Sequence, residues 1–287
     1  MIPALLQRLC DNAAIFPPGL MPLDQAVPAH AEHERAPYSD MVGAFIVSAD
    51  VVPELPALLA DRTVTLPLAV TAPKGPHQLS AVLKQVPELP VDVKTIEVAV
   101  PGAADEFFAD LASVLTATDH DVFVEVPRDD RRQPILEMLA RTPYKAKFRT
   151  GGVRADMHPD EAELALAITA VVGAGLPFKA TAGLHHAVRN TAPATGFEQH
   201  GFLNVMLAVD AALRGKTVSE VASELALRDE HAIAARITEL DDTRVQAIRA
   251  TFAGFGTCSI AEPLADLIAL GLVPARLLRQ ESQETRV

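Results

Sequence analysis

The sequence predicts an α/β fold, a (β/α)8 barrel of the TIM type with a helical insertion near the C-terminus. Short runs of β-forming residues alternate with amphipathic helical runs along most of the 287 residues. This alternation favours a parallel sheet covered by helices. Seven such strands at regular spacing favour a closed barrel over an open, doubly wound sheet. No G-x-G-x-x-G motif follows the first strand, which weakens a dinucleotide-binding alternative.

The predicted elements follow one another in strict alternation. The strands are short apolar runs, expected at residues 14–16, 42–47, 66–72, 95–100, 122–126, 145–150 and 178–182. Helical patterns lie between them, at residues 23–34, 52–60, 78–86, 104–116, 132–141 and 159–173. The last of these helices has acidic residues in its first turn and glycines near its end, which is the asymmetry that helix termini favour.

The eighth strand has two candidates, at residues 201–205 and 252–258. Residues 202–213 are more typical of a helix, so we favour 252–258, followed by a helix at 262–270. Ser259 and Glu262 form a capping-box pattern at the start of that helix. Residues 216–250 then form a helical insertion before the last strand. No linker or internal repeat divides the chain, and we expect one barrel domain over residues 1–287.

Composition excludes several classes of function. The net charge of −12 argues against nucleic acid or an anionic membrane as a partner, because an acidic surface attracts neither. Cys10 and Cys258 are the only cysteines, so no disulfide framework is expected and a reducing compartment fits. Neither a signal peptide nor a membrane span is apparent. We therefore expect a cytoplasmic protein, with a homo-oligomer left open.

Basic residues occur within two of the predicted strands. In a strand, successive side chains point to opposite faces. Lys147 and Arg149 therefore share one face, with Phe148 on the other, and Lys179 shares a face with Thr181 in the next strand. An apolar outer face and a cationic inner face suit a barrel whose interior mouth performs chemistry.

Two acidic residues continue this pattern on the preceding strands, because Glu97 and Glu125 each interrupt an apolar run. Buried charges must pair, so one interpretation is a structural ion-pair network. The other is catalytic. Lysines on adjacent strands lie about 5 Å apart, and each should lower the pKa of the other. A lysine with a lowered pKa is a nucleophile that forms a Schiff base with a carbonyl, and the two glutamates would move protons.

At these residues the sequence resembles the class I aldolase barrels of the deoxyribose-phosphate aldolase type. The run Lys147-Phe148-Arg149-Thr150-Gly151 matches that family's sixth-strand K-x-x-T-G motif, and the run from Lys179 to Leu184 is similar to its seventh-strand motif. The resemblance covers residues 95–186. It implies Lys147 as the Schiff-base lysine, Lys179 as the residue that tunes it, and Glu97 and Glu125 as acids of the fourth and fifth strands.

The chain also departs from this family. Glu97 stands where the family usually has Asp, and Arg149 replaces a small residue. Leu184-His185-His186 stands where the family has a phosphate-binding turn. We expect a polar or anionic small-molecule substrate, held by residues near the strand ends: Arg149, Thr150, His185, His186, His200, Gly256 and Ser259. The turn at residues 254–259 resembles one that holds an anion at a helix N-terminus, although a plain capped helix start explains it as well.

Three alternatives of function remain open from the sequence. The first is a carbon–carbon lyase that works through a lysine Schiff base without a cofactor. The second is a barrel hydrolase or isomerase that uses Glu and His, with or without a metal; no H-x-H, HExxH or C-x-x-C motif is present, so no metal ligand is assigned. The third is a non-catalytic anion-binding barrel. Residues 187–200 suit a lid or substrate contact, and Cys258 has no evident base partner.

Overall fold

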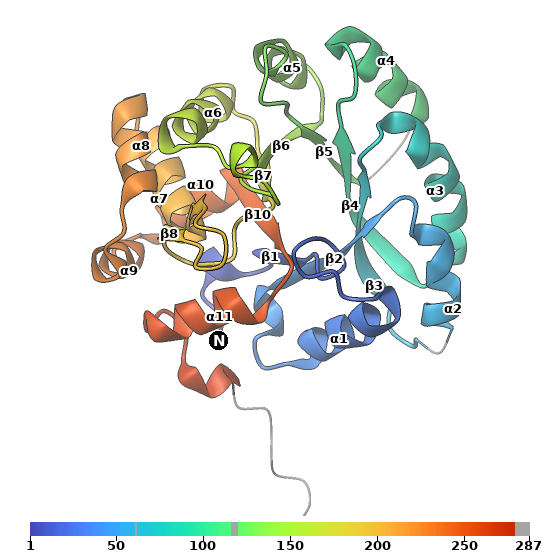
Figure 1. Cartoon of the computed structure of the whole chain (residues 1–287), viewed down its shortest axis with the longest axis horizontal. Helices are drawn as coiled ribbons and strands as arrows, with labels where there is room; N and C mark the ends of the chain where they lie inside the picture. The colour runs from blue at the N-terminus through green and yellow to red at the C-terminus, as the bar shows by residue number, and fades with distance from the viewer. Residues whose placement is uncertain (61, 116–119, 279–287) are drawn as a thin grey trace, which may run out of the picture.

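Eight parallel strands close into a barrel in the computed structural model, which describes residues 1–60, 62–115 and 120–278 (Figure 1). Their order around the barrel is β1-β10-β7-β6-β5-β4-β3-β2. The strands are β1 (Cys10–Asn12), β2 (Val42–Ser48), β3 (Leu66–Ala72), β4 (Val91–Ala99), β5 (Asp121–Glu125), β6 (Lys145–Arg149), β7 (Phe178–Thr181) and β10 (Phe252–Thr257). The predicted (β/α)8 barrel is confirmed, and the second candidate for the eighth strand closes it.

Helices cover the outside of this barrel (Figure 1). Those between the first seven strands are α1 (Leu23–Arg35), α2 (Leu55–Leu59), α3 (Leu79–Gln85), α4 (Ala104–Val114), α5 (Arg132–Leu139) and α6 (Glu161–Gly173). The predicted helix at 104–116 has its last residue outside the described part of the chain. Helix α6 begins where the sequence indicates, because the Asp160 carboxylate accepts a hydrogen bond from the Glu163 amide at 2.8 Å.

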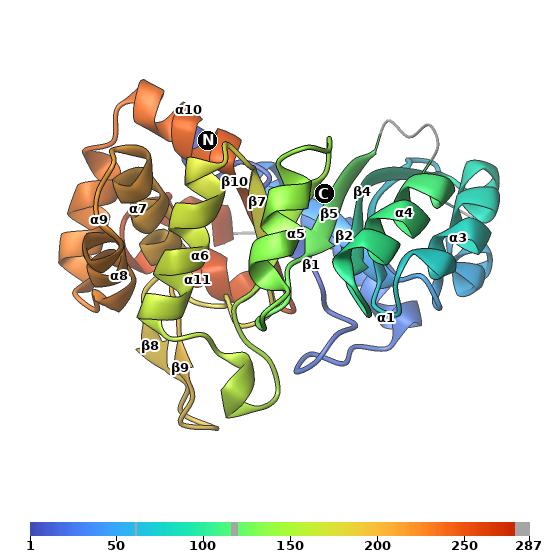
Figure 2. The ribbon, with the colours of Figure 1, turned by 90° about the horizontal axis from the view of Figure 1, so that it is seen from above.

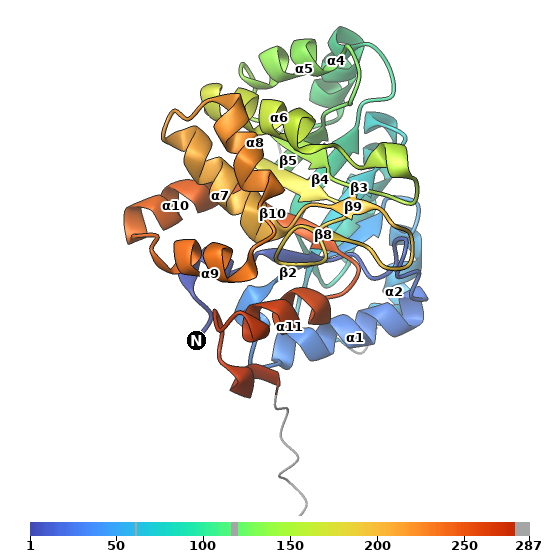
Figure 3. The same ribbon diagram turned by 60° about the vertical axis from the view of Figure 1, so that its left-hand side comes forward.

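Four helices separate β7 from β10, namely α7 (Phe202–Leu213), α8 (Val218–Ala226), α9 (Glu230–Thr238) and α10 (Asp242–Thr251). They lie together on one side of the barrel (Figure 3). Helix α7 is apolar on nearly all faces because it is buried between the barrel and helices α8 and α10. Helix α8 begins with a capping box between Thr217 and Glu220. Helix α11 (Ala261–Ala269) follows β10.

Three connections project from the same face of the barrel (Figure 2). They are the segment after β1, the loop after β6 and the antiparallel hairpin of β8 (Asn190–Thr191) and β9 (Glu198–Gln199). All three follow the carboxyl end of a strand, which is the face on which barrel enzymes carry their active sites. Helix α10 and the N-terminus of the chain lie on the opposite side.

The first strand differs from the prediction at residues 14–16. It is β1, whose Cys10 pairs with Phe255 of β10 and with Val42 of β2. The apolar residues 14–16 belong to the connection that follows. The misplacement has a physical cause: Asp11 and Asn12 of β1 are polar, and a polar strand is recognisable only once the interior of the barrel is known to be polar.

The barrel interior has two different halves. Ala44 and Ile46 of β2 and Ala69 of β3 form a small apolar cluster, against which Phe16 packs. Strands β4 to β7 instead carry charged residues inward. The outward residues of these strands pack under the helices, as in the contact between the Phe148 and Phe178 rings at 5.5 Å. No helix in the described residues is long and apolar enough to cross a membrane.

Candidate active site

A chain of alternating charges crosses the interior of the barrel. Lys179 of β7 forms ion pairs with Asp11 of β1 and Glu97 of β4. The other oxygen of Glu97 lies 2.8 Å from Nζ of Lys147 on β6. The side chains of Glu97, Lys147 and Lys179 are only 1%, 6% and 3% exposed. The parallel register places Lys147 directly beside Lys179, and Glu97 therefore separates two ammonium groups that would otherwise repel each other.

The chain of charges continues upward to the mouth of the barrel. Nζ of Lys147 lies 3.1 Å from Oε2 of Glu125 on β5. The other carboxylate oxygen of Glu125 accepts a hydrogen bond from Nε of Arg149 at 3.0 Å and forms an ion pair with its Nη2 at 2.9 Å. Three carboxylates and three cations thus alternate, and the predicted quartet of Glu97, Glu125, Lys147 and Lys179 lies together. Such pairing makes the burial of these charges tolerable.

A cavity of about 320 Å³ lies above this network at the carboxyl ends of the strands. Lys147, Glu97 and Glu125 line one wall, and Phe16 and Ile46 belong to an apolar wall opposite. Its remaining lining residues are Ala13, Pro17, Thr71, Pro73, Ala99, Arg149, Gly152, Val153, Met157, Thr181, Ala182, His185, Gly256 and Cys258. Lys179 does not line it, since this lysine lies toward the other end of the barrel. A small compound with one polar and one apolar side would fit this cavity.

The expected pKa shift of the two lysines is wrong in direction. Burial alone lowers the pKa of Lys147, but attraction to Glu97 and Glu125 outweighs burial and raises it. Burial is likewise outweighed at Lys179, where Asp11 and Glu97 raise the pKa. Repulsion between the lysines is the smaller effect because each has two carboxylate neighbours. Burial alone raises the pKa of Glu97, but the two ammonium groups lower it to about 2.

The predicted substrate-binding residues divide into two groups. Arg149, His185 and Gly256 line the cavity. Thr150 does not, because its hydroxyl donates to the carbonyl oxygens of Thr181 and Ala182 and ties β6 to β7. Ser259 does not line it either; it precedes α11, where its Oγ accepts a hydrogen bond from the Glu262 amide at 3.3 Å.

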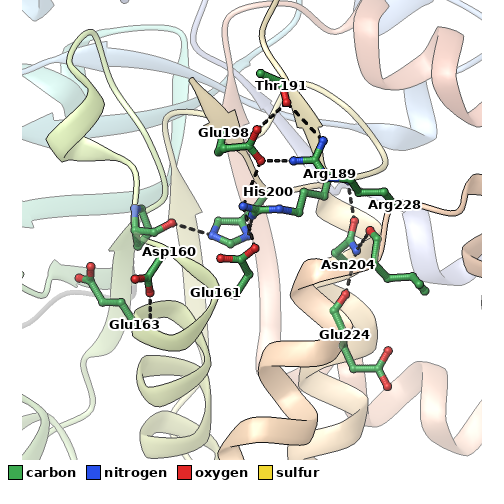
Figure 4. Close-up of polar contacts among 12 residues, drawn as sticks. Asp160, Glu161, Glu163, Arg189, Thr191, Glu198, His200, Asn204, Glu224 and Arg228 are labelled. Atoms are coloured by element: carbon green, nitrogen blue, oxygen red, sulfur yellow. Dashed lines mark hydrogen bonds and ion pairs between the residues drawn. The ribbon is translucent and has the colours of Figure 1, made fainter. Parts of the chain in front are cut away.

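His186 and His200 also lie away from the cavity. Nδ1 of His186 lies 3.1 Å from Asp266 of α11, on the outer side of the barrel. His200 is buried between the hairpin and α6, where its Nε2 lies 2.9 Å from the carbonyl oxygen of Pro159 and its Nδ1 lies 3.3 Å from Arg189 (Figure 4). Both histidines therefore hold the connection after β7 in place.

His185 has partners at the mouth of the cavity. Its Nδ1 lies 2.9 Å from the carboxylate of Glu262, and that carboxylate does not close the predicted capping box because the Ser259 amide donates to Thr257 instead. Cys258 Sγ lies 3.8 Å from the same ring nitrogen, a neighbour that the sequence did not indicate. Burial and the nearby Glu262 raise the pKa of the Cys258 thiol, which favours its protonated form.

The two glycine turns after β6 and β7 pack against each other. A Cβ atom at Gly151 would lie 2.7 Å from the Cα atom of Gly183, and Gly183 has a φ of +76°. Side chains at either position would push the loops apart. The glycines that follow the two lysine strands therefore bring the β6 and β7 connections together beside the cavity.

Asp11 is the member of the charge network that the sequence did not assign. Its Oδ1 accepts a hydrogen bond from the Ala44 amide at 2.6 Å, while its other oxygen meets Lys179. A Cβ at Gly43 would lie 1.9 Å from Asp11 Oδ1, so Gly43 makes the space for this carboxylate. The sequence signal for this role was an acidic residue between Cys10 and Asn12. It could be recognised only once residues 10–12 were known to form the first strand. No cluster of three or more metal-ligating side chains occurs among the described residues.

Comparisons with known proteins add one structural likeness. No protein-family model matches the chain, and no curated protein sequence matches it. Among solved structures, the chain is similar to a monomeric dihydrodipicolinate synthase variant, at 12% sequence identity and a TM-score of 0.39. The match covers 94% of this chain and 99% of that one. A likeness this weak says nothing about activity, so the geometry of the barrel interior carries the functional conclusion.

Proposed function

We propose that this protein is an aldolase-like carbon–carbon lyase that acts on a small polar carbonyl compound through a Schiff base on Lys147. One observation carries the proposal. Lys147 is a buried lysine that lines a cavity at the carboxyl end of a barrel, and two carboxylates lie within 3.1 Å of its amine. A nucleophilic amine, proton acceptors and space for a substrate therefore occur at one place.

The choice between the two lysines follows from access. Lys147 lines the cavity, whereas Lys179 is enclosed by Asp11 and Glu97 and lies deeper in the barrel. A carbonyl compound in the cavity reaches Lys147 without disturbing the deeper pairs. Lys179 then acts as a positioning residue, because it holds Glu97 in place against Lys147.

The first step consumes a neutral amine. Lys147 gives its extra proton to a carboxylate, for which Glu125 lies at 3.1 Å and Glu97 at 2.8 Å. The amine nitrogen attacks the carbonyl carbon, the oxygen takes up protons and leaves as water, and a cationic iminium forms. A carboxylate then takes the proton of a hydroxyl group on the β-carbon of the substrate, and the bond between the α- and β-carbons breaks. The β-carbon leaves as an aldehyde or ketone, and the electron pair of the broken bond remains in the iminium system as an enamine. Protonation of the enamine and addition of water then release the product and restore the amine.

The raised pKa of Lys147 is consistent with this sequence of steps. The carboxylates that hold the ammonium also face the iminium, which carries the same positive charge at the same place. The site therefore disfavours loss of the proton but stabilises the cation that follows, and stabilisation of a developing charge is a common source of catalysis. Arg149 and His185 at the mouth, opposite the apolar Phe16 and Ile46, would orient a polar or anionic substituent.

Trapping of the iminium tests the proposal. The protein is incubated with a panel of small aldehydes, ketones and 2-oxo acids, reduced with borohydride, and analysed by intact and peptide mass spectrometry. We expect one stoichiometric adduct on Lys147, lost in Lys147→Arg. Lys145→Arg is the matched control, because Lys145 precedes Lys147 by two residues on β6 and pairs with Asp121.

Two results would contradict the proposal. One is the absence of any adduct across the panel from a folded protein. The other is an adduct that persists at full yield in Lys147→Arg, which would place the reactive amine elsewhere.

A further inference from the structure

A second cavity, of about 280 Å³, lies at the opposite end of the barrel. It is lined by residues from the amino-terminal halves of the strands, among them Gly43 of β2, Lys94 of β4 and Lys179 of β7. Arg8, which precedes β1, and Arg249 of α10 complete its basic lining. This is the side on which α10 and the N-terminus lie (Figure 2). The cavity is therefore separated from the Lys147 cavity by the charge network.

The lining of this second cavity is rich in positive charge, although the chain has a net charge of −12. Four cations line it, against the two carboxylates Asp11 and Asp121. Those carboxylates already have partners, since Asp11 meets Lys179 and Asp121 meets Lys145 at 2.6 Å. Lys94 forms an ion pair with Asp92 of the same strand. The positive charge of the two arginines is thus left without an ion pair within the described residues.

Within residues 1–60, 62–115 and 120–278, the hydrogen-bond partners of the Arg249 guanidinium are neutral. Its guanidinium donates to the carbonyl oxygens of Gln7, Phe252 and Ala253, at 2.8 to 3.2 Å. Burial lowers its pKa, with the nearby Asp11 acting in the opposite direction. Carbonyl oxygens orient a guanidinium but carry no compensating charge, so an anion close to Arg249 would gain a charge-assisted hydrogen bond.

Arg8 has an unusual backbone conformation at the edge of the same cavity. Its φ is +49°, in the left-handed region that residues with a side chain rarely adopt. Its side chain makes no hydrogen bond or ion pair with any residue that the structure describes. The strained backbone is fixed by the segment before β2, because the Arg8 amide donates to the carbonyl oxygen of Asp40 and the Leu9 amide to that of Met41. Strain of this kind gathers at functional sites.

Gly254 and Gly43 lie beside the second cavity at positions where a side chain would not fit. A Cβ at Gly254 would lie 2.6 Å from the carbonyl oxygen of Leu9, and its φ of +152° is also unfavourable for other residues. A side chain at Gly43 would displace Asp11, as described above. The cavity therefore combines two arginines that lack an ion pair within the described residues with space that the two glycines leave open.

We propose that this second cavity is a binding site for a small oxyanion, such as inorganic phosphate or a compact carboxylate, contacted by Arg8, Lys94 and Arg249. The site is distinct from the Lys147 cavity and does not depend on Schiff-base chemistry. An anion there would join the segment before β1, strand β4 and helix α10, and so stabilise the fold. The negative net charge of the chain disfavours general anion binding, which makes a specific response easy to recognise.

The test uses thermal unfolding of the full chain against inorganic phosphate, with ionic strength held constant by chloride. A ligand of the folded state raises the unfolding temperature in a saturable manner. We expect this response in the wild type and an apparent affinity about tenfold weaker in Arg8→Gln and in Lys94→Gln, from loss of one charge-assisted contact. Both residues are exposed, so both variants should fold. Lys84→Gln, at an exposed lysine of α3, is the matched control and should respond like the wild type.

Arg149→Gln removes a cation from the other cavity, and the part of the response that depends on Arg8 should persist in this variant. A stronger response to malonate than to phosphate, with the same sensitivity to Arg8→Gln, would support the site and identify carboxylates as its ligands. The proposal is overturned if stabilisation never saturates, if Arg8→Gln and Lys94→Gln respond like the wild type, or if only Arg149→Gln abolishes the response.

Discussion

Two lysines on neighbouring strands differ in what surrounds the amine at the end of each side chain. Lys147 and Lys179 are direct partners in the parallel register and both are buried. The amine of Lys147 meets a cavity, whereas that of Lys179 is enclosed by Asp11 and Glu97. Both have raised pKa values, since carboxylates outweigh burial. The same residue type therefore serves as a reactive group in one place and as a support in the other.

The raised pKa of Lys147 predicts how iminium trapping depends on pH. Below that pKa the neutral amine is a small fraction, which grows about tenfold with each pH unit. The initial trapping rate at Lys147 should therefore increase from pH 7 to beyond pH 9 without a plateau, when measured as adduct formed per minute at constant carbonyl concentration. A plateau near pH 7 would instead mean that the lysine has a lowered pKa in the protein.

Removal of Lys179 should destabilise the protein strongly. Lys179→Met leaves Asp11 with no cation partner and Glu97 with Lys147 alone. Loss of one member of a buried ion pair costs about 3–5 kcal/mol in free energy of unfolding, which urea denaturation at pH 7 can measure. Lys145→Met is the control, because its pair with Asp121 is partly exposed and its loss should cost less than about 1 kcal/mol. Equal losses in the two variants would contradict a buried network.

At the scale of elements, the β8–β9 hairpin is anchored by a set of polar contacts (Figure 4). Arg189 is its centre, with ion pairs to Glu161 of α6 at 2.8 Å and to Glu198 of β9 at 3.2 Å. Nδ1 of His200 lies 3.3 Å from this guanidinium. The Asn204 side chain of α7 accepts from the Arg189 amide and donates to two carbonyl oxygens at the end of α8. These contacts anchor the connection after β7 to α6 and α7, and its role as a lid or substrate contact stays a prediction.

His200 makes the stability of this region depend on pH. Burial is the main cause that lowers its pKa to about 4, against an ordinary value of 6.5. Between pH 4 and pH 6.5, His200 is therefore protonated in the unfolded chain and neutral in the folded protein. Stability is highest above pH 6.5 and falls as pH drops toward 4, by about 3 kcal/mol at most for this group.

The corresponding variant is His200→Gln, studied by urea unfolding at pH values from 7.5 to 4. It should show a shallower fall in unfolding free energy between pH 6.5 and 4 than the wild type. Arg228→Gln removes an exposed contact to Glu198 in the same hairpin but leaves His200 in place, so it should keep the slope of the wild type. Parallel curves for His200→Gln and the wild type would mean that His200 does not titrate in this way.

For the whole molecule, the sequence was informative where residues repeat a regular pattern. Strands β2 to β7 and β10 and the helices between them alternate in hydrophobicity, so their order and the barrel could be predicted. The inward face of Lys147 and Arg149 followed from the period of two in a strand. Strand β1 could not be placed, because its Asp11 is only partly exposed through pairing with Lys179 rather than through being apolar.

The pattern of apolar and polar residues did not predict which groups the side chains contact or how far they lie from the cavity. Thr150 and Ser259 stand near strand ends, yet both hydroxyl groups bond to backbone near them. His200 is far from the cavity because the hairpin carries it to α6. The sign of the lysine pKa shifts depended on Asp11 together with Glu97 and Glu125, and a count of charges along one chain cannot give the distances among them.

The charge network as a whole predicts a separate loss of stability in strong acid. The pKa of Glu97 is lowered from 4.5 to about 2 in the folded protein, where two ammonium groups outweigh burial. Its contribution is therefore present above pH 4.5 and lost as pH falls toward 2, by about 3 kcal/mol. This window lies below that of His200, so unfolding free energy should fall in two stages between pH 7 and 2.

The double variant Glu97→Gln with Lys147→Met removes one charge of each sign and retains the Lys179–Asp11 and Arg149–Glu125 pairs. It should reduce the lower stage by the contribution of Glu97 and keep the upper one, because Glu125 also has a lowered pKa and retains Arg149. Urea unfolding across this pH range would reveal the change, and a lower stage of undiminished size would assign it to acids other than Glu97.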